Sequence, residues 1–139
     1  MKADEVIRDE SEDFNRHDAA AFTAHYAPEA IVHDPQYPEP LRGSAAIKKD
    51  VADFFAAFPD IRGSVIGTVV SGDAYAVEWS MRGTHRGPLL GPSGEIPATN
   101  KTVEINAAAF GRLDKEGRIA EERRYYDLAG LMAQLGVMQ

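Results

Sequence analysis

The spacing of apolar residues predicts four helices, three near the start of the chain and one at its end. The clearest lies over residues 44–58, where apolar side chains recur at i, i+4, i+7, i+8 and i+11: Ile47, Val51, Phe54, Phe55 and Phe58. A weaker, acidic pattern over residues 3–16 predicts a first helix. Asp18 is suited to cap a short second helix that carries Tyr26. Apolar residues over 128–135 predict the last helix.

After residue 59 the apolar period changes to two, which is typical of strands. In the first of these strands the residues expected to share one face are Ile61, Val65 and Val69. A tight turn at residues 71–73 leads to a strand whose apolar face is formed by Tyr75, Val77, Trp79 and Met81. Such alternation indicates an antiparallel sheet with one buried side. Further strands are predicted at residues 30–34, 102–112 and 118–127, the last two joined by a hairpin turn.

Residues 83–102 contain six glycines and prolines after Gly83 and are expected to form an irregular loop: Gly87, Pro88, Gly91, Pro92, Gly94 and Pro97. Helices precede a run of mostly antiparallel strands, and this order favours an α+β fold over a repeating βαβ fold. We therefore expect one domain over residues 1–139, a cone in which a strongly curved, mostly antiparallel sheet packs against the N-terminal helices. The mouth of such a cone is a natural place for an internal pocket.

Composition narrows the possible partners and the compartment. The chain is 44% apolar and 27% charged, as is ordinary for a globular protein, and no apolar run is long enough to cross a membrane. Its formal charge of −7 disfavours nucleic acid, because a phosphate backbone would be repelled. Without cysteine, disulfides and thiolate metal sites are excluded, and a reducing cytoplasm is the expected location. The acidic N-terminus does not resemble a signal peptide.

Several short motifs together resemble one known family, the SnoaL-like polyketide cyclases of the nuclear transport factor 2-like superfamily, from about Phe14 to Gly136. The motifs are His33-Asp34-Pro35, Leu41-Arg42-Gly43, the segment 54–60, Gly83-Thr84-His85, Gly87-Pro88, Gly91, Ile96-Pro97, the segment 117–121 and Tyr126-Asp127. The resemblance implies a cone fold and ring closure by intramolecular aldol condensation, without metal or cofactor. It also implies a homodimer or a higher homo-oligomer.

The resemblance places the catalytic acid/base at Asp127, at the end of the last strand. Removal of this carboxyl from water would raise its pKa toward the operating pH. The alternative interpretation is that Asp127 simply caps the helix that begins at Leu128. One departure from the family is Arg123, which stands where relatives often carry tryptophan and is expected to make that wall of the pocket more polar.

Two histidines are candidates for orienting a substrate. His33, on a short strand, could polarise a carbonyl group, and His85, at the start of the long loop, could bind a ligand. The alternative for His33 is a core residue bonded to the backbone, and the alternative for His85 is a loop residue exposed to solvent. Their spacing does not match a zinc site, so no metal is expected.

The expected pocket lining combines apolar and polar side chains. The substrate-binding candidates are Trp79, Met81, Phe54, Phe58, Asn106, Tyr126 and Arg123. Tyr125 and Tyr126 point to opposite faces of their strand, so at most one of them enters the pocket easily. Glu78 is a further candidate if its face of the sheet points inward.

These observations lead to one enzymatic hypothesis and two alternatives. The first is a cyclase or isomerase that performs cofactor-independent acid/base chemistry on a small, mostly apolar carbonyl compound. The second is a non-catalytic protein of the same fold that binds a small molecule. The third, an epoxide-hydrolase-like enzyme, requires an arginine between two pocket aspartates, which the predicted strands do not reveal.

Overall fold

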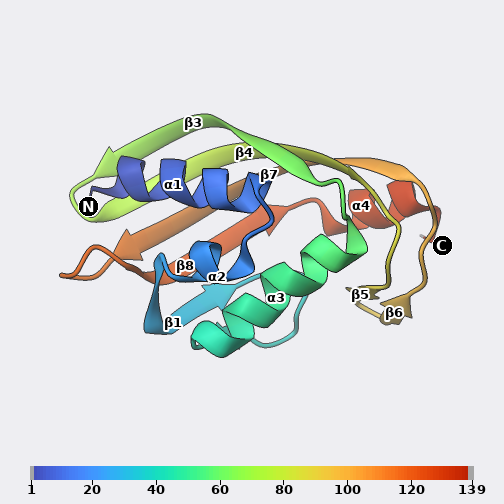
Figure 1. The fold of residues 1–139 in the computed structure, drawn as a ribbon, viewed down its shortest axis with the longest axis horizontal. Coiled ribbons are helices and arrows are strands. Elements are labelled where there is room, and N and C mark those ends of the chain that lie inside the picture. Colours follow the sequence, from blue (N-terminus) through green and yellow to red (C-terminus); the bar gives the residue numbers. More distant parts are fainter. Residues whose placement is uncertain (1, 138–139) are drawn as a thin grey trace.

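The fold is built on a curved six-stranded sheet with the order β2-β1-β8-β7-β4-β3, in a computed structural model that describes residues 2–137 (Figure 1). Neighbouring strands are antiparallel except β1 and β8, which are parallel. The strands are β1 (Tyr26–His33), β2 (Leu41–Arg42), β3 (Arg62–Ser71), β4 (Ala74–Thr84), β7 (Thr102–Leu113) and β8 (Ile119–Tyr126). A separate hairpin consists of β5 (Leu89–Gly91) and β6 (Gly94–Ile96). The α+β class predicted from the sequence is confirmed.

The helices lie mainly along the concave side of the sheet. They are α1 (Ala3–Asn15), α2 (Ala19–Thr23), α3 (Ser44–Ala57) and α4 (Leu128–Leu135). Figure 1 shows α1, α2 and α3 across this side, while α4 continues from β8 at one end of the sheet. Among the helices of the described residues, none is long and apolar enough to cross a membrane.

Local sequence signals explain where several elements begin and end. Helix α2 starts at its predicted cap, where the backbone N–H of Ala21 donates to the Asp18 carboxylate at 3.0 Å. The predicted turn between β3 and β4 places Gly72 at φ +60°, a conformation that glycine adopts without steric cost. Helix α3 also matches its prediction, and it buries Ile47, Val51 and Phe55.

An aromatic cluster joins these helices to the sheet. The ring of Phe14 on α1 lies 5.2 Å from Phe55 on α3 and 5.0 Å from Trp79 on β4, both in edge-to-face arrangements. Such pairs add to the free energy gained from burying the rings. The cluster packs α1 and α3 against the sheet, and Phe14 and Trp79 also line the pocket described below.

Three local predictions were wrong. Tyr26 belongs to β1 rather than to the second helix, because that strand begins four residues earlier than expected. In β3 the pairing register shifts between Val65 and Gly67, so the strand changes phase and Val69 is 71% exposed on the outer face. The stretch 83–102 is not wholly irregular, since it contains the β5–β6 hairpin.

Candidate active site

A largely apolar cavity of about 150 Å³ is lined by residues of the sheet and of all four helices. An apolar cavity of that size can hold a molecule such as benzene. Its apolar walls include Ile7, Phe14, Phe22, Val51, Phe54, Val77, Trp79, Met81, Leu89, Ile105, Leu128, Leu131 and Met132. The cavity therefore encloses about one ring of a ligand.

The polar end of the cavity is an arginine held between two aspartates. Nη1 of Arg124 lies 3.2 Å from Oδ2 of Asp34 and 3.0 Å from Oδ2 of Asp50, and Nε lies 3.0 Å from Oε1 of Glu122. The side chains of the three acids are only 5–10% exposed. Negative charge thus exceeds positive charge at this end, in a setting where water screens the interactions weakly.

Three separate elements bring these groups together. Strand β8 presents Glu122, Arg124 and Tyr126 on its inner face, because every second side chain of a strand points the same way. Asp34 follows the last residue of β1, where its Oδ1 accepts the backbone N–H of Gln36 at 2.9 Å in a tight turn. Asp50 comes from the middle of α3.

Tyrosines donate to each of the three acids. Tyr126 donates to Asp34 at 2.6 Å, Tyr37 to Asp50 at 2.6 Å and Tyr26 to Glu122 at 2.9 Å. Burial and the neighbouring carboxylates raise the pKa of all three hydroxyls, so they remain donors. Each acid is consequently fixed in one orientation.

Burial alone would lower the pKa of the Arg124 guanidinium. The negative charges around it, including Glu122, Asp50 and Asp34, outweigh that effect, and its pKa rises well above the usual value. Arg124 therefore keeps its charge at the base of the cavity.

Asp127 does not lie in the cavity, so the prediction of a buried acid/base at this position was wrong. Its side chain is exposed and caps α4 by accepting the backbone N–H of Gly130 at 2.8 Å. The capping interpretation describes this residue correctly. The catalytic role predicted for Asp127 required a buried carboxyl group, and this carboxyl group is exposed to solvent.

Neither of the two candidate histidines lines the cavity. His33 is on the outer face of the sheet, where its Nε2 lies 3.2 Å from Glu121. His85 is fully buried beside Phe58, and its Nδ1 accepts the backbone N–H of Thr99 at 3.2 Å. Burial lowers the pKa of His85, which favours a neutral, structural imidazole.

The predicted lining residues divide into two groups. Trp79, Met81, Phe54 and Tyr126 line the cavity. The others do not: Phe58 is fully buried behind the wall, and Asn106, Arg123 and Glu78 are exposed. Tyr125 is 55% exposed, opposite to Tyr126, as strand alternation requires.

Sequence reasoning missed Asp34, Asp50 and Arg124, which form the constellation that an epoxide-hydrolase-like reading required. A signal was available, because the placement of Tyr126 in the pocket carries Arg124 to the same face. The aspartates were harder to find, since one lies just after a strand and the other on a helix. Within residues 2–137, no group of three or more histidine or acidic side chains has an arrangement that could hold a metal ion.

A family model for the SnoaL-like polyketide cyclases matches residues 5–135. The chain belongs to this family. The SnoaL-like assignment inferred from the motifs is therefore confirmed, and it agrees with the cone fold and the internal cavity. Among curated proteins, none matches the sequence.

Solved structures resemble this SnoaL-like chain over almost its whole length. TsrD from Streptomyces laurentii is 21% identical with a TM-score of 0.83, covering 97% of this chain and 95% of its own. IdmH from Streptomyces antibioticus is 29% identical with a TM-score of 0.76, covering 96% and 98%. SalBIII, described as an epoxide hydrolase/cyclase-like enzyme in pyran ring formation, is 21% identical with a TM-score of 0.72, covering 89% of both chains.

Proposed function

We propose that this SnoaL-like protein is a cyclase or isomerase that performs cofactor-independent acid/base chemistry on a small, mostly apolar carbonyl compound. The observation that supports this proposal is a fixed group of acids around Arg124 at the end of an apolar cavity. Apolar walls bind the carbon skeleton, and an oriented carboxylate can remove a proton from carbon beside a carbonyl. Asp34 takes the acid/base role first assigned to Asp127.

Asp34 is the better of the two aspartates for this role because of its neighbours. Its Oδ1 accepts from Tyr126, a cavity wall residue, whereas Asp50 is held by Tyr37, which is outside the lining. Asp34 Oδ2 has Arg124 as its partner and keeps a lone pair for a substrate proton. Asp50 balances the charge of Arg124 and holds it in place.

The proposed reaction conserves atoms and charge. The proton on the carbon next to a carbonyl moves to Asp34, and the electron pair left behind forms an enolate. The enolate carbon then attacks a second carbonyl carbon of the same molecule, forming a carbon–carbon bond and closing a ring. The new alkoxide takes that proton back from Asp34, and the enzyme ends in its starting protonation state. Because the cavity encloses about one ring, the forming ring is enclosed and the rest of a larger substrate extends outward.

The test compares two aspartate variants with a small diketone that can close to a six-membered ring. Asp34→Asn removes the proton acceptor while keeping the side-chain shape, and we expect turnover to fall roughly 100-fold or more. Asp127→Asn is the matched control, because that side chain is exposed and outside the cavity. Ring closure is followed by NMR, together with deuterium uptake from solvent. Equal turnover in wild type and Asp34→Asn contradicts the proposal, as does selective loss in Asp127→Asn.

Epoxide opening is the second candidate, favoured by the position of Arg124 between Asp34 and Asp50. Here an aspartate would accept the proton of a hydroxyl group while the oxygen attacks an epoxide carbon and breaks a carbon–oxygen bond of the strained ring. The opened epoxide oxygen would then take that proton from the aspartate. A hydroxy-epoxide that can close to a pyran distinguishes the two chemistries when it is supplied beside the diketone. Binding of both compounds without turnover of either supports the non-catalytic alternative.

A further inference from the structure

Glu10 is an acidic residue of the cavity that Arg124 does not neutralise. It lies on the third turn of α1 and lines the cavity. Its Oε2 atom is buried and has no hydrogen-bond partner within residues 2–137. A buried polar atom without a partner is costly, and because the Glu10 side chain lines the cavity, a bound ligand can supply the partner.

The charges around Glu10 determine its protonation state. Burial is the largest influence and the negative charge of Glu122 the next, and together they raise the pKa of Glu10 well above the usual value. The charge of Arg124 and the nearby Tyr26 hydroxyl act in the opposite direction, while Asp13 adds to the rise. Nε of Arg124 donates to Glu122 and Nη1 to Asp34 and Asp50, while Nη2 donates to the Tyr26 hydroxyl. The neutral, protonated form of Glu10 is therefore favoured over its carboxylate.

We infer that Glu10, as a neutral carboxylic acid, donates a hydrogen bond to an acceptor oxygen of the ligand. This inference deepens the proposed function and rests on it for the catalytic consequence. A buried carboxylic acid kept neutral in an apolar site is an effective donor to an oxygen that gains negative charge. The ligand class is thereby narrowed to small apolar compounds whose buried end carries a ketone, ester or epoxide oxygen.

Glu10 and Asp34 then have complementary roles on two sides of Arg124. Nε of Arg124 faces Glu122, the neighbour of Glu10, and Nη1 faces Asp34. The ligand oxygen lies toward Glu10, and the proton to be removed lies toward Asp34. In the aldol reaction the hydrogen bond from Glu10 stabilises the enolate oxygen, while Glu10 keeps its own proton.

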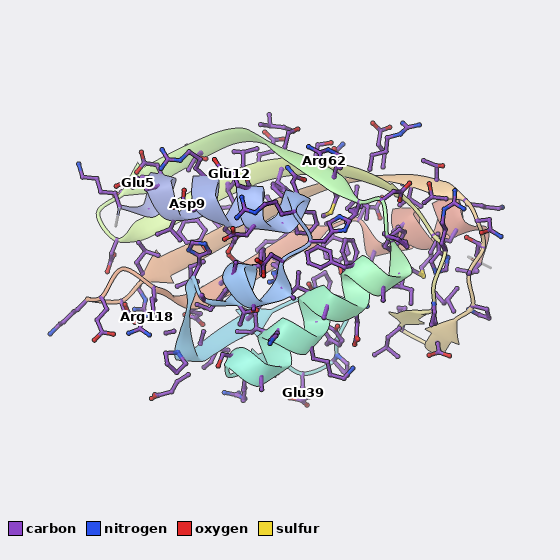
Figure 2. All side chains as sticks on the ribbon, in the orientation of Figure 1. Glu5, Asp9, Glu12, Glu39, Arg62 and Arg118 are labelled. Atoms are coloured by element: carbon purple, nitrogen blue, oxygen red, sulfur yellow. The ribbon has the colours of Figure 1, made fainter. Side chains whose placement is uncertain are left out.

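The test uses acetophenone as the probe, with its carbonyl carbon isotopically labelled, because its binding can be observed without turnover. A hydrogen bond to the carbonyl lowers the carbonyl stretching frequency in the infrared spectrum. We expect a lowered frequency in wild type and a return to the value of an apolar solvent in Glu10→Leu. The control is Glu12→Gln, an exposed acid on the same helix (Figure 2), which keeps the wild-type frequency. An unchanged frequency in Glu10→Leu overturns the inference.

A second readout observes the proton directly. The difference spectrum between wild type and Glu10→Gln at neutral pH is expected to contain a carboxylic-acid band, and its absence overturns the inference. Asp34→Asn separates the two proposals, because it removes turnover but leaves the lowered carbonyl frequency. If Asp34→Asn keeps full turnover while the frequency still depends on Glu10, the proposed function fails and the Glu10 inference stands. For the reaction itself, we expect roughly 100-fold slower turnover in Glu10→Gln.

Discussion

Replacement of Arg124 by methionine tests whether the buried charge cluster holds the site together. The substitution removes the hydrogen bonds from Nε to Glu122 at 3.0 Å and from Nη1 to Asp50 at 3.0 Å and Asp34 at 3.2 Å. It leaves three buried acids without their cation. Removal of one partner from a buried ion pair costs about 3–5 kcal/mol, because the remaining charge stays uncompensated. For a chain of this size the loss corresponds to a fall in Tm of about 10–20 °C.

The assay is thermal and urea unfolding of Arg124→Met beside Arg123→Met. Arg123 is the neighbouring residue, but its side chain is 52% exposed and pairs with Glu121 on the outer face. Its loss is expected to change the free energy of unfolding by less than about 0.5 kcal/mol. Addition of Glu122→Gln to Arg124→Met is expected to restore part of the stability, because one uncompensated charge is removed. If Arg124→Met unfolds within about 2 °C of wild type, the cluster does not carry the stability assigned to it.

Three further predictions concern other parts of the molecule. The pKa of Glu10 is higher in the folded state than in the unfolded state, so protonation of Glu10 stabilises the fold. This stabilisation is fully present below the unfolded-state pKa of about 4.3 and is lost as the pH rises from there through the folded-state pKa. Glu10→Gln is therefore expected to gain stability relative to wild type between pH 4 and pH 8 in urea titrations, and a constant difference would refute this. The homodimer stays a prediction, and the outer face of the sheet carries the exposed apolar side chains of Val69, Phe110 and Tyr125 that could form its interface. Phe110→Asp is therefore expected to shift the sedimentation coefficient toward that of the monomer. A monomeric wild-type protein would contradict the prediction. Nε2 of Gln36 donates to the backbone oxygen of Leu90 at 2.6 Å, so Gln36→Ala is expected to speed amide hydrogen exchange in the β5–β6 hairpin. Unchanged exchange rates would show that this hydrogen bond does not stabilise the hairpin.

Elements with a strong period were predictable from the sequence. Apolar spacing correctly predicted the buried face of α3 and the inner face of β4, where Trp79 and Met81 line the cavity. The phase change in β3 was not predictable in this way. It arises from a bulge between Val65 and Gly67, and pattern alone does not mark an unpaired residue in a strand.

The site was harder to predict because its members come from distant segments. Arg124 meets Asp50 across 74 positions and Asp34 across 90, and no local pattern records either contact. The sequence motif directed attention to Asp127, whose capping hydrogen bond to Gly130 is a local interaction. Asp34, the aspartate proposed as acid/base, is part of the His33-Asp34-Pro35 motif, but only the fold shows that it points inward while His33 points outward.

The most direct test of this account is a crystal structure with acetophenone bound. We expect its ring against Trp79 and Phe54, its oxygen within about 3 Å of a Glu10 carboxyl oxygen and its methyl carbon within about 3.5 Å of Asp34. A probe bound elsewhere, with the cavity closed by its own side chains, would contradict the claim that these two acids act on one enclosed ligand.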